Sequence, residues 1–350
     1  QQSKMPGIGC YGAAISACAK SAQWGLALDL LRDVSRRGLQ LGLICHNQAL
    51  SACEKGGQWL LALAQLHEIR DQKLRPNVIS FSAVTSACAQ GGHWLLALGQ
   101  LQEVLQQDLE PDVIIFSAAI SACEKGGQWV WALAKLREMS QCGLTPNVIT
   151  YSAAMGACAK GGQWLLVLAQ LREMRQRNLE PNEVSYNAAI GACATGAQWE
   201  LALEQFRLMR RRSLQPNLIC HNAALSACEK GGQWLLALSH LHEMRRRKMG
   251  VDVITYNAVI SACEKGAQWL LAVAHLRDMR ERGLDPGVIS YRAAIGACGG
   301  SQWALALALL RAMRKQRHCP NGSAAGIAAR ACFAASAWRG AVWALRSERA

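Results

Sequence analysis

A fixed step of 35 residues runs through almost the whole chain. The stretch 148–182, VITYSAAMGACAKGGQWLLVLAQLREMRQRNLEPN, returns with few changes before and after it. An aromatic residue or a histidine marks the fourth place of each copy: Tyr11, His46, Phe81, Phe116, Tyr151, Tyr186, His221, Tyr256 and Tyr291. A period of roughly 20–50 residues is the signature of a repeat array, in which each copy forms one structural unit.

Each copy predicts two short helices joined by a tight turn. Thr150 precedes an apolar run at helical spacing, and we expect its hydroxyl to cap that helix. Gly161 and Gly162 end the run, because glycine accepts the left-handed conformation that is common after a helix. Trp164 opens a second apolar run, and Pro181 closes the unit. The repeat is therefore predicted to be a helical hairpin.

A single hairpin cannot cover both of its apolar faces, whereas a stack of similar hairpins can. We therefore predict an all-α fold, an α-solenoid of nine helix-turn-helix repeats followed by a C-terminal capping helix. The large residues of the second helix, among them Trp164 and Leu165, are expected to supply most of the buried area.

The same period predicts how the chain is divided. Residues 1–7 form a short lead-in, and residues 322–350 form an Ala-rich C-terminal cap or a degenerate repeat. The nine repeats are expected at 8–42, 43–77, 78–112, 113–147, 148–182, 183–217, 218–252, 253–287 and 288–321. Since the chain starts at Gln1 without an initiator methionine, we expect a fragment or a processed form in which a targeting segment is not visible.

Composition narrows the range of partners. The formal net charge of +14 favours an anionic partner such as nucleic acid or an acidic membrane surface. No uninterrupted apolar stretch is long enough to span a bilayer. Nine of the 15 cysteines hold one place in the repeat and no C-x-x-C pair occurs, so we expect small core residues in a reducing compartment.

No catalytic constellation is recognisable in the sequence. The pairs His67-Glu68 and His242-Glu243 lack a third metal ligand, and we expect them on the surface. The H-x-E and C-x-x-C motifs of a zinc deaminase are missing, as are an aspartate cluster and a phosphate-binding glycine loop. The sequence therefore predicts a protein that is not an enzyme and that needs no cofactor and no metal.

The amino-acid sequence around each repeat boundary is distinctive. Copies end in P-N or P-D, continue with V-I-x-Y-N/S, and carry Lys before Gly-Gly and a late methionine such as Met174. These features, over about 8–321, resemble the pentatricopeptide repeat (PPR) family, although the frequent S-A-C-E-K-G-G-Q-W departs from its usual consensus. The resemblance implies a right-handed superhelix that binds single-stranded RNA, with one base read per repeat. The tetratricopeptide repeat, with a period of about 34 residues and another core motif, does not fit.

The resemblance assigns three places in each repeat to base recognition. The fifth and the last residues would read the base edge: Asn47, Asn77, Ser82, Asp112, Ser117, Asn147, Ser152, Asn182, Asn187, Asn217, Asn222, Asp252 and Asn257. The second residue would sandwich the base: Ile44, Ile79, Ile114, Ile149, Val184, Ile219 and Ile254. Amide, hydroxyl and carboxylate groups differ in their hydrogen-bond pattern, as a code requires. The competing interpretation is that these are ordinary turn and capping residues.

A lysine recurs at the thirteenth place of the repeat, at Lys20, Lys55, Lys125, Lys160, Lys230 and Lys265. We expect this row to follow a phosphate backbone. The alternative, which is compatible with phosphate binding, is that each lysine caps the end of a helix.

The pairing tendencies of the family make repeats two to seven read 5′-YGAAYU-3′, where Y is C or U. The resemblance also implies a monomer in the mitochondrion or chloroplast that acts in organellar RNA processing, stabilisation or translation and can recruit an RNA-processing protein; no membrane partner is expected. Two alternatives stay open. The chain could be a helical-repeat scaffold that holds a peptide or protein, or the RNA-targeting fragment of a larger RNA-processing enzyme.

Overall fold

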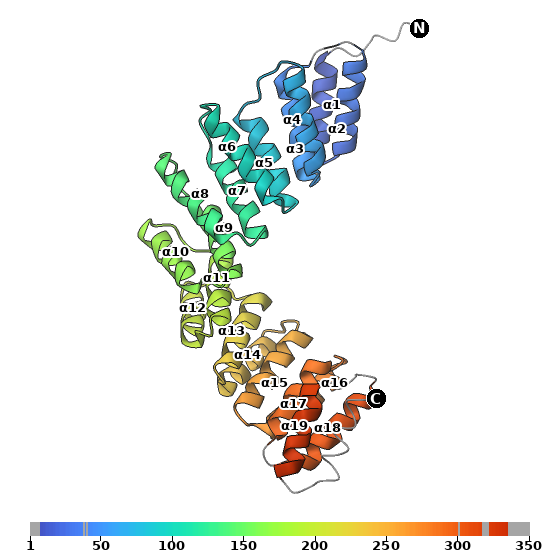
Figure 1. Ribbon diagram of the computed structural model, residues 1–350, viewed down its shortest axis with the longest axis vertical. Helices are drawn as coiled ribbons and strands as arrows, with labels where there is room; N and C mark the ends of the chain where they lie inside the picture. The colour runs from blue at the N-terminus through green and yellow to red at the C-terminus, as the bar shows by residue number, and fades with distance from the viewer. Residues whose placement is uncertain (1–7, 38, 40, 300–301, 317–321, 335–350) are drawn as a thin grey trace. The chain divides into compact units, whose positions relative to one another are not determined.

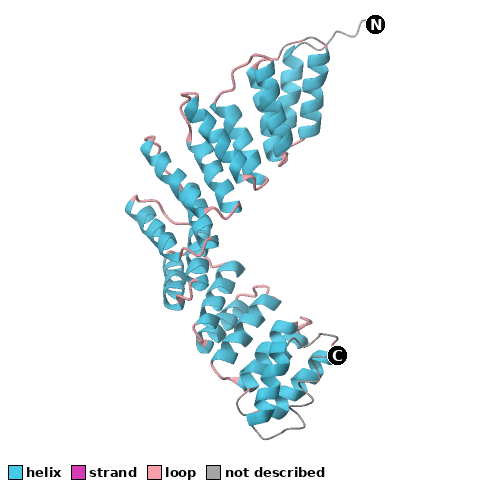
Figure 2. Ribbon diagram, in the orientation of Figure 1, coloured by secondary structure: helices cyan, strands magenta, loops and turns pink. Residues whose placement is uncertain are grey.

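The computed structural model describes residues 8–37, 39, 41–299, 302–316 and 322–334. All regular secondary structure in these ranges is helical (Figure 2). The chain divides into two compact units, residues 1–181 and 182–350. The predicted all-α repeat fold is confirmed, while the predicted lead-in at 1–7 and the C-terminal segment after residue 334 lie outside the described ranges.

The first unit is a run of helical hairpins (Figure 1). Its helices are α1 (Ile8–Lys20), α2 (Trp24–Arg36), α3 (Leu43–Lys55), α4 (Trp59–Asp71), α5 (Val78–Gln90), α6 (Trp94–Gln106), α7 (Val113–Lys125), α8 (Trp129–Gln141), α9 (Val148–Lys160) and α10 (Trp164–Gln176). The odd-numbered helices pack on one another in chain order. Each of α2, α4, α6 and α8 packs both on the first helix of its own hairpin and on that of the next, so the core continues from repeat to repeat.

The second unit repeats this arrangement. Its helices are α11 (Glu183–Thr195), α12 (Trp199–Arg211), α13 (Leu218–Lys230), α14 (Trp234–Arg246), α15 (Val253–Lys265), α16 (Trp269–Glu281), α17 (Val288–Cys298), α18 (Trp303–Lys315) and α19 (Gly322–Ala334). The last of these, α19, packs on both α17 and α18. It thereby covers the faces that a further hairpin would otherwise bury, as a capping helix must.

Each first helix begins earlier in the repeat than predicted. The N-cap of α9 is Asn147, whose Oδ1 accepts a hydrogen bond from the backbone N–H of Thr150 at 2.9 Å. The prediction that Thr150 caps this helix is wrong. A cap needs extended backbone before the first turn, which Asn147 has with φ −98° and ψ 178°. Thr150 lies inside the first turn, is fully buried and donates its own hydroxyl to Asn147.

The core is built around the fourth residue of the repeat. Tyr151, Tyr186 and Tyr256 are among the largest fully buried side chains. The prediction that the second helix supplies most of the buried area through residues such as Trp164 and Leu165 is wrong at those two places, since Trp164 is half-buried and Leu165 is 64% exposed. Small residues on the first helices let neighbouring hairpins approach, and the central aromatic ring fills the space between them.

The tryptophan nevertheless explains the paired glycines. A Cβ on Gly161 would lie 2.3 Å from the Cδ1 atom of Trp129 in the preceding repeat, so only glycine fits there. The second glycine of the pair, Gly162, has φ +70°, a left-handed conformation that glycine adopts at little cost. The two glycines are therefore required for different reasons, one for packing between repeats and one for the turn.

The recurring cysteines are core residues, as predicted. All described cysteines are free thiols, and those of the repeated place from Cys53 to Cys298 are buried. Burial raises the pKa of Cys53 and of Cys193 to about 11, which leaves these thiols protonated and poorly reactive near neutral pH.

Candidate nucleic-acid interface

The second residue of each repeat is aliphatic yet exposed. The exposed fraction is 74% for Ile44 and 67% for Ile149 in the first unit, and 57% for Val184 and 64% for Ile254 in the second. Ile79, Ile114 and Ile219 are exposed in the same way. A large apolar side chain left in water at the start of each first helix from α3 to α17 has no role in the core, which favours a role in binding.

Two of these side chains line a cavity of about 390 Å³ in the first unit. Its volume lies in the range of ligand pockets, roughly 300–1,000 Å³. The lining contains each kind of residue predicted for RNA recognition: the sandwiching Ile44 and Ile79, the base-reading Asn47 and Asn77, and the phosphate-binding Lys20 and Lys55. The structure thus gathers, at one place between neighbouring hairpins, residues that lie far apart in the sequence.

The fifth and the last residues of a repeat meet across the loop between helices. Asn47 donates from Nδ2 to the Oδ1 atom of Asn77 at 3.1 Å, and the backbone N–H of Ser80 donates to the same oxygen at 3.1 Å. In the next repeat, Ser82 donates its hydroxyl to Asp112 Oδ1 at 3.3 Å. The predicted base-reading pairs of these two repeats are therefore neighbours in space.

The last residue of the repeat also caps the following first helix. Its Oδ1 atom accepts from a backbone N–H in that helix at each of Asn77, Asp112, Asn147, Asn182, Asn217 and Asp252. The cap uses the oxygen that Asn and Asp share. The other terminal atom differs, because Asn carries the Nδ2 donor where Asp carries a second acceptor oxygen. Capping therefore leaves free the atom in which Asn and Asp differ, and it is compatible with the predicted base reading.

The lysines at the thirteenth place are exposed, and Lys55, Lys125, Lys160 and Lys230 each donate a hydrogen bond to the preceding repeat. Lys55 donates to the backbone carbonyl of Ala19 at 2.8 Å, and Lys160 donates to that of Glu124 at 2.9 Å. Each thus caps the C-terminal end of the preceding first helix, rather than of its own helix. An ammonium group has three donors, so an exposed lysine that makes one such bond can still bind a phosphate.

A row of glutamates beside the lysines was not recognised from the sequence. Burial raises the pKa of Glu124, and the charge of Lys160 opposes this shift. In the second unit, the charge of Arg292 likewise opposes the raised pKa of Glu229 and of Glu264. These carboxylates partly balance the positive row, and the repeated E-K pair was the sequence signal for them.

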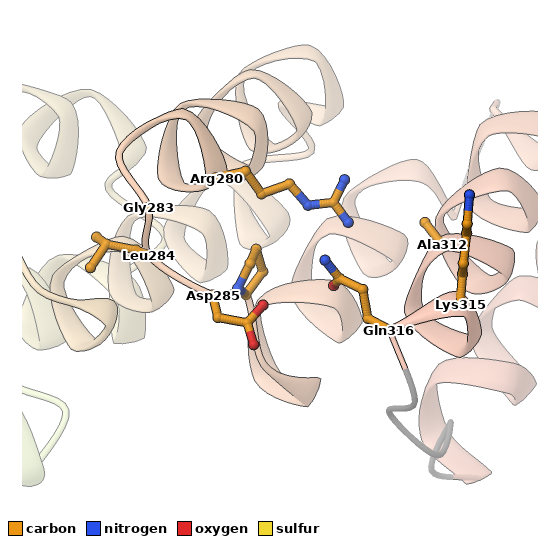
Figure 3. Close-up of a pocket in the computed structure, with 8 residues that line it drawn as sticks. Arg280, Gly283, Leu284, Asp285, Ala312, Lys315 and Gln316 are labelled. Atoms are coloured by element: carbon orange, nitrogen blue, oxygen red, sulfur yellow. The ribbon is translucent and has the colours of Figure 1, made fainter.

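A larger cavity, of about 620 Å³, lies between the C-terminal ends of α16 and α18 (Figure 3). Arg280, Asp285 and Lys315 line it, and Arg280 donates a hydrogen bond to the hydroxyl of Tyr291. Its lining contains none of the residues predicted to read or sandwich a base. This cavity is therefore distinct from the candidate interface.

The other candidate chemistry is only partly on the surface. His67 and His242 are exposed, as predicted, whereas the Glu243 side chain is only 15% exposed and forms ion pairs with Arg210 and Arg247 at 3.1 and 2.8 Å. In the part of the chain that the structure describes, no group of three or more His, Cys, Asp or Glu side chains could hold a metal ion. None of the described helices has the length and apolar character needed to cross a membrane.

Solved structures with a similar fold are helical-repeat proteins. Two are the pentatricopeptide repeat protein PPR10 and a cysteine-substituted form of it, each in complex with an 18-nt psaJ RNA element, at a TM-score of 0.66 and 19% identity. A third is PPR10 from maize, at a TM-score of 0.53 and 21% identity. The matches cover 98–99% of this chain but only 56–59% of those chains, so the chain spans little more than half their length.

Sequence comparison gives the family. No curated protein matches the chain significantly. The profile described as "Pentatricopeptide repeat domain" matches residues 29–90, 100–161, 170–230 and 239–301, and the profile described as "PPR repeat" matches 9–39, 149–179 and 219–249. Together with the repeated hairpins and the cavity between them, these matches show that the chain belongs to the pentatricopeptide repeat family.

Proposed function

We propose that this chain binds single-stranded RNA in a sequence-selective way, reads one base per hairpin, and is not itself an enzyme. The observation that carries the proposal is the cavity shared by Ile44, Ile79, Asn47 and Asn77. A nucleotide offers three surfaces to a protein: the faces of the base, the edge of the base and the phosphate. The exposed aliphatic groups, the polar pair and the two lysines match these three surfaces in that order.

A base would enter between the isoleucines of consecutive repeats. Its faces would cover Ile44 and Ile79, which are 74% and 62% exposed without it, and this burial supplies affinity that does not depend on sequence. Its edge would meet Asn47 and Asn77, whose donors and acceptors distinguish the bases. The lysines would contact the phosphates, which fix the register of the strand.

The RNA complexes of PPR10 support this assignment, because a protein of the same fold binds an 18-nt RNA element. Under the family's pairing tendencies, repeats two to seven read 5′-YGAAYU-3′. Asn47 with Asn77 selects a pyrimidine and favours C over U, Ser82 with Asp112 selects G, and the pairs that follow select A, A, a pyrimidine with C favoured over U, and U.

The cellular part of the proposal rests on family membership. We infer action on transcripts of the mitochondrion or chloroplast, in RNA processing, stabilisation or translation. A monomer that covers several nucleotides would exclude nucleases from them or deliver a recruited RNA-processing protein to them.

The test is binding to a short RNA that contains UGAAUU, against a scrambled RNA and a peptide library, at roughly 50 and 200 mM salt. Preference for the predicted order at the higher salt supports the proposal. Equal and salt-sensitive binding to both RNAs contradicts sequence reading, and selective binding of a peptide favours the scaffold alternative.

A matched pair of variants separates the interface from the rest of the surface. Ile79 and Leu60 are 62% and 63% exposed, but only Ile79 lines the cavity. Ile79→Ser should weaken RNA binding, whereas Leu60→Ser should not. Equal effects of the two substitutions would contradict a role for the sandwiching residues.

A further inference from the structure

The side chain of the third residue of a repeat contacts the fifth residue of the repeat before it at Ser80, Thr150, Cys220, Thr255 and Ser290. We propose that this residue determines specificity as a positioning residue, because its side chain fixes which group of the preceding fifth residue can face a base. The proposal rests on the proposed function and adds a place in the repeat that the second, fifth and last residues do not include.

The arrangement is complete around Asn47. The hydroxyl of Ser80 donates to Asn47 Oδ1 at 2.6 Å and has a longer contact, 3.0 Å, with Asn77 Oδ1. Asn47 donates from Nδ2 to Asn77 Oδ1, while the backbone N–H of Asn77 donates to Ser80 Oγ at 3.3 Å. Asn77 Oδ1 caps the backbone N–H of Ser80, so the Asn47 atom beside that oxygen is the Nδ2 donor and the carbonyl of Asn47 faces Ser80. Its amide nitrogen, with one hydrogen unused in these bonds, is held beside Asn77.

The same contact recurs in the second unit. Thr255 Oγ1 lies 2.8 Å from Asn222 Oδ1 and 2.7 Å from Asp252 Oδ1, so its single hydrogen is shared between these two acceptors. Ser290 Oγ donates to Asn257 Oδ1 at 2.5 Å. In that repeat the last residue is glycine and makes no side-chain cap, so Ser290 alone orients the fifth residue. In all three cases the hydroxyl engages the oxygen of the amide and leaves its nitrogen to be presented.

When the fifth residue is serine, the hydroxyl of the third residue sets the direction of its hydrogen. Thr150 Oγ1 donates to Asn147 Oδ1 at 2.9 Å, because that oxygen can only accept. Ser117 Oγ lies 2.8 Å from Thr150 Oγ1 and must therefore donate to it. Ser117 is left with lone pairs, so it presents an acceptor to the base.

The chain also contains natural exceptions at this place. Ile115 offers no hydroxyl, and Ser82 instead donates directly to Asp112. Cys220 donates a weak S–H bond to Asn187 Oδ1. Hydroxyl, thiol and aliphatic groups therefore occur at equivalent positions, and two repeats with the same fifth and last residues can differ in how firmly the fifth residue is oriented.

The experiment removes one hydroxyl group and measures the preference of the protein at one base of the RNA. Thr255→Val keeps the branched shape, and Asp252 can still cap the backbone N–H of residue 255. The substrates are RNAs with UGAAUU or UGAAUA, which differ only at the base assigned to repeat seven. The expected result is a loss of roughly three- to tenfold in preference for U over A, the contribution of about one neutral hydrogen bond. Preference at the other five bases should stay the same.

Two controls give the result its meaning. Thr255→Ser retains the hydroxyl and should keep the preference of the unaltered protein. Thr150→Val should reduce selectivity at the base of repeat four and leave repeat seven unchanged. A general structural defect would weaken binding to all RNAs together. It would not change the preference at a different base for each site of substitution.

The outcomes also separate this inference from the proposed function. If the unaltered protein prefers U and Thr255→Val keeps that preference, or weakens both RNAs equally, the third residue has no part in specificity and the proposed function stands. If the unaltered protein does not distinguish the two RNAs, base reading by repeat seven is wrong and the inference falls with it.

Discussion

Repeats two and seven, residues 43–77 and 218–252, have closely similar sequences but belong to different units of the molecule. Over their first 21 residues they differ only at the sixth place, where Gln48 faces Ala223 in the alignment. Both carry histidine at the fourth place and both begin their helices at equivalent residues. Their later differences therefore show what single substitutions do on a common frame.

The first informative difference is in the core. In repeat two, Gln65 lies 3.0 Å from the Nδ1 atom of His46, within hydrogen-bond distance. In repeat seven the equivalent residue is His240, whose ring centroid lies 5.6 Å from that of His221. Both ring nitrogens of His221 lack a hydrogen-bond partner among the described residues. Burial lowers the pKa of His221 and of His240 to about 4, and the nearby His221 charge adds to the shift at His240.

The second difference is at the last residue. Asn77 and Asp252 both cap the next first helix through Oδ1, to the backbone N–H of Ser80 at 3.1 Å and of Thr255 at 2.8 Å. Folding therefore depends on an atom that the two side chains share, whereas base reading would depend on the atom in which they differ. A repeat can change its specificity at this place without losing its cap.

The largest expected effect is an acid sensitivity that is stronger around the histidine pair of the second unit than around His46 of the first, whose pKa burial also lowers. The pKa of His221 and His240 is about 4 in the folded protein against an ordinary value of 6.5. Protonation thus favours unfolding, and the stabilisation present above pH 6.5 is lost as the pH falls towards 4. The loss at pH 5 should be about 2 kcal/mol for one ring, and the losses of the two rings are not additive because the charge of His221 contributes to the shift of His240. Hydrogen exchange at pH 7 and 5 should show α13 and α14 losing more protection than α3 and α4.

His240→Gln is the control for this prediction, because it recreates the pairing of repeat two. It should reduce the acid sensitivity of α13 and α14. Loss of protection in α3 and α4 before α13 and α14 would show that the histidine pair is not the sensitive element.

The next effect tests the packing that the two repeats share. A Cβ on Gly231 would lie 2.5 Å from the ring of Trp199, and overpacking of this kind costs about 1–3 kcal/mol. Gly231→Ala should lower the unfolding free energy of the second unit by that amount. Gly232→Ala should cost less, about 1 kcal/mol, because Ala267 holds the equivalent place with φ +54°. Urea unfolding measures both, and an equal or reversed order would contradict the assignment of the two glycines.

The smallest effect concerns the lysines. Lys55 and Lys230 occupy equivalent places and donate to the backbone carbonyls of Ala19 and Thr195 at 2.8 and 3.2 Å. Lys55→Met and Lys230→Met should each weaken binding to all RNAs alike. Each should also reduce the salt dependence of binding, with a change of about 0.7 in the slope of log affinity against log salt concentration. Binding to matched RNAs over a salt series checks this. A change in base preference, or an unchanged slope, would show that these lysines do not contact phosphate.

Much of the fold could be predicted because the 35-residue period defines the repeating structural unit. The period places two helices in each repeat, and the glycines, Asn178 and Pro181 mark where they end. The cap was misassigned because Thr150 and Asn147 are both good capping residues, and only the backbone shows which of them is extended before the first turn. The large size of Trp164 favours a place in the core, whereas equivalent tryptophans such as Trp129 are half-buried and pack on a half-buried glycine of the next repeat.

The candidate site could be predicted in part. Ile44 and the equivalent residues of the other repeats are exposed at the second place of the repeat, which the family resemblance assigns to base sandwiching. Helical periodicity alone would not separate these residues from the core. The role of Ser80 and Thr255 was not foreseen, because a contact between residue i and residue i+33 joins different repeats and has no local signal. The isolated histidine pair of repeat seven was hidden for the same reason, since it requires His221 and His240 on two helices to be brought together.

The most direct test of the account exchanges the last residues of the two repeats in one chain, Asn77→Asp with Asp252→Asn. Selection from an RNA library that is randomised at the six predicted bases reports the preference of every repeat. If each hairpin reads one base, repeat two moves from C towards U, repeat seven moves from U towards C, and the other four positions stay unchanged. Thermal unfolding is unaffected, because both caps remain. Unchanged preferences at these two positions, or a shift at other positions, would contradict the reading of one base by each hairpin.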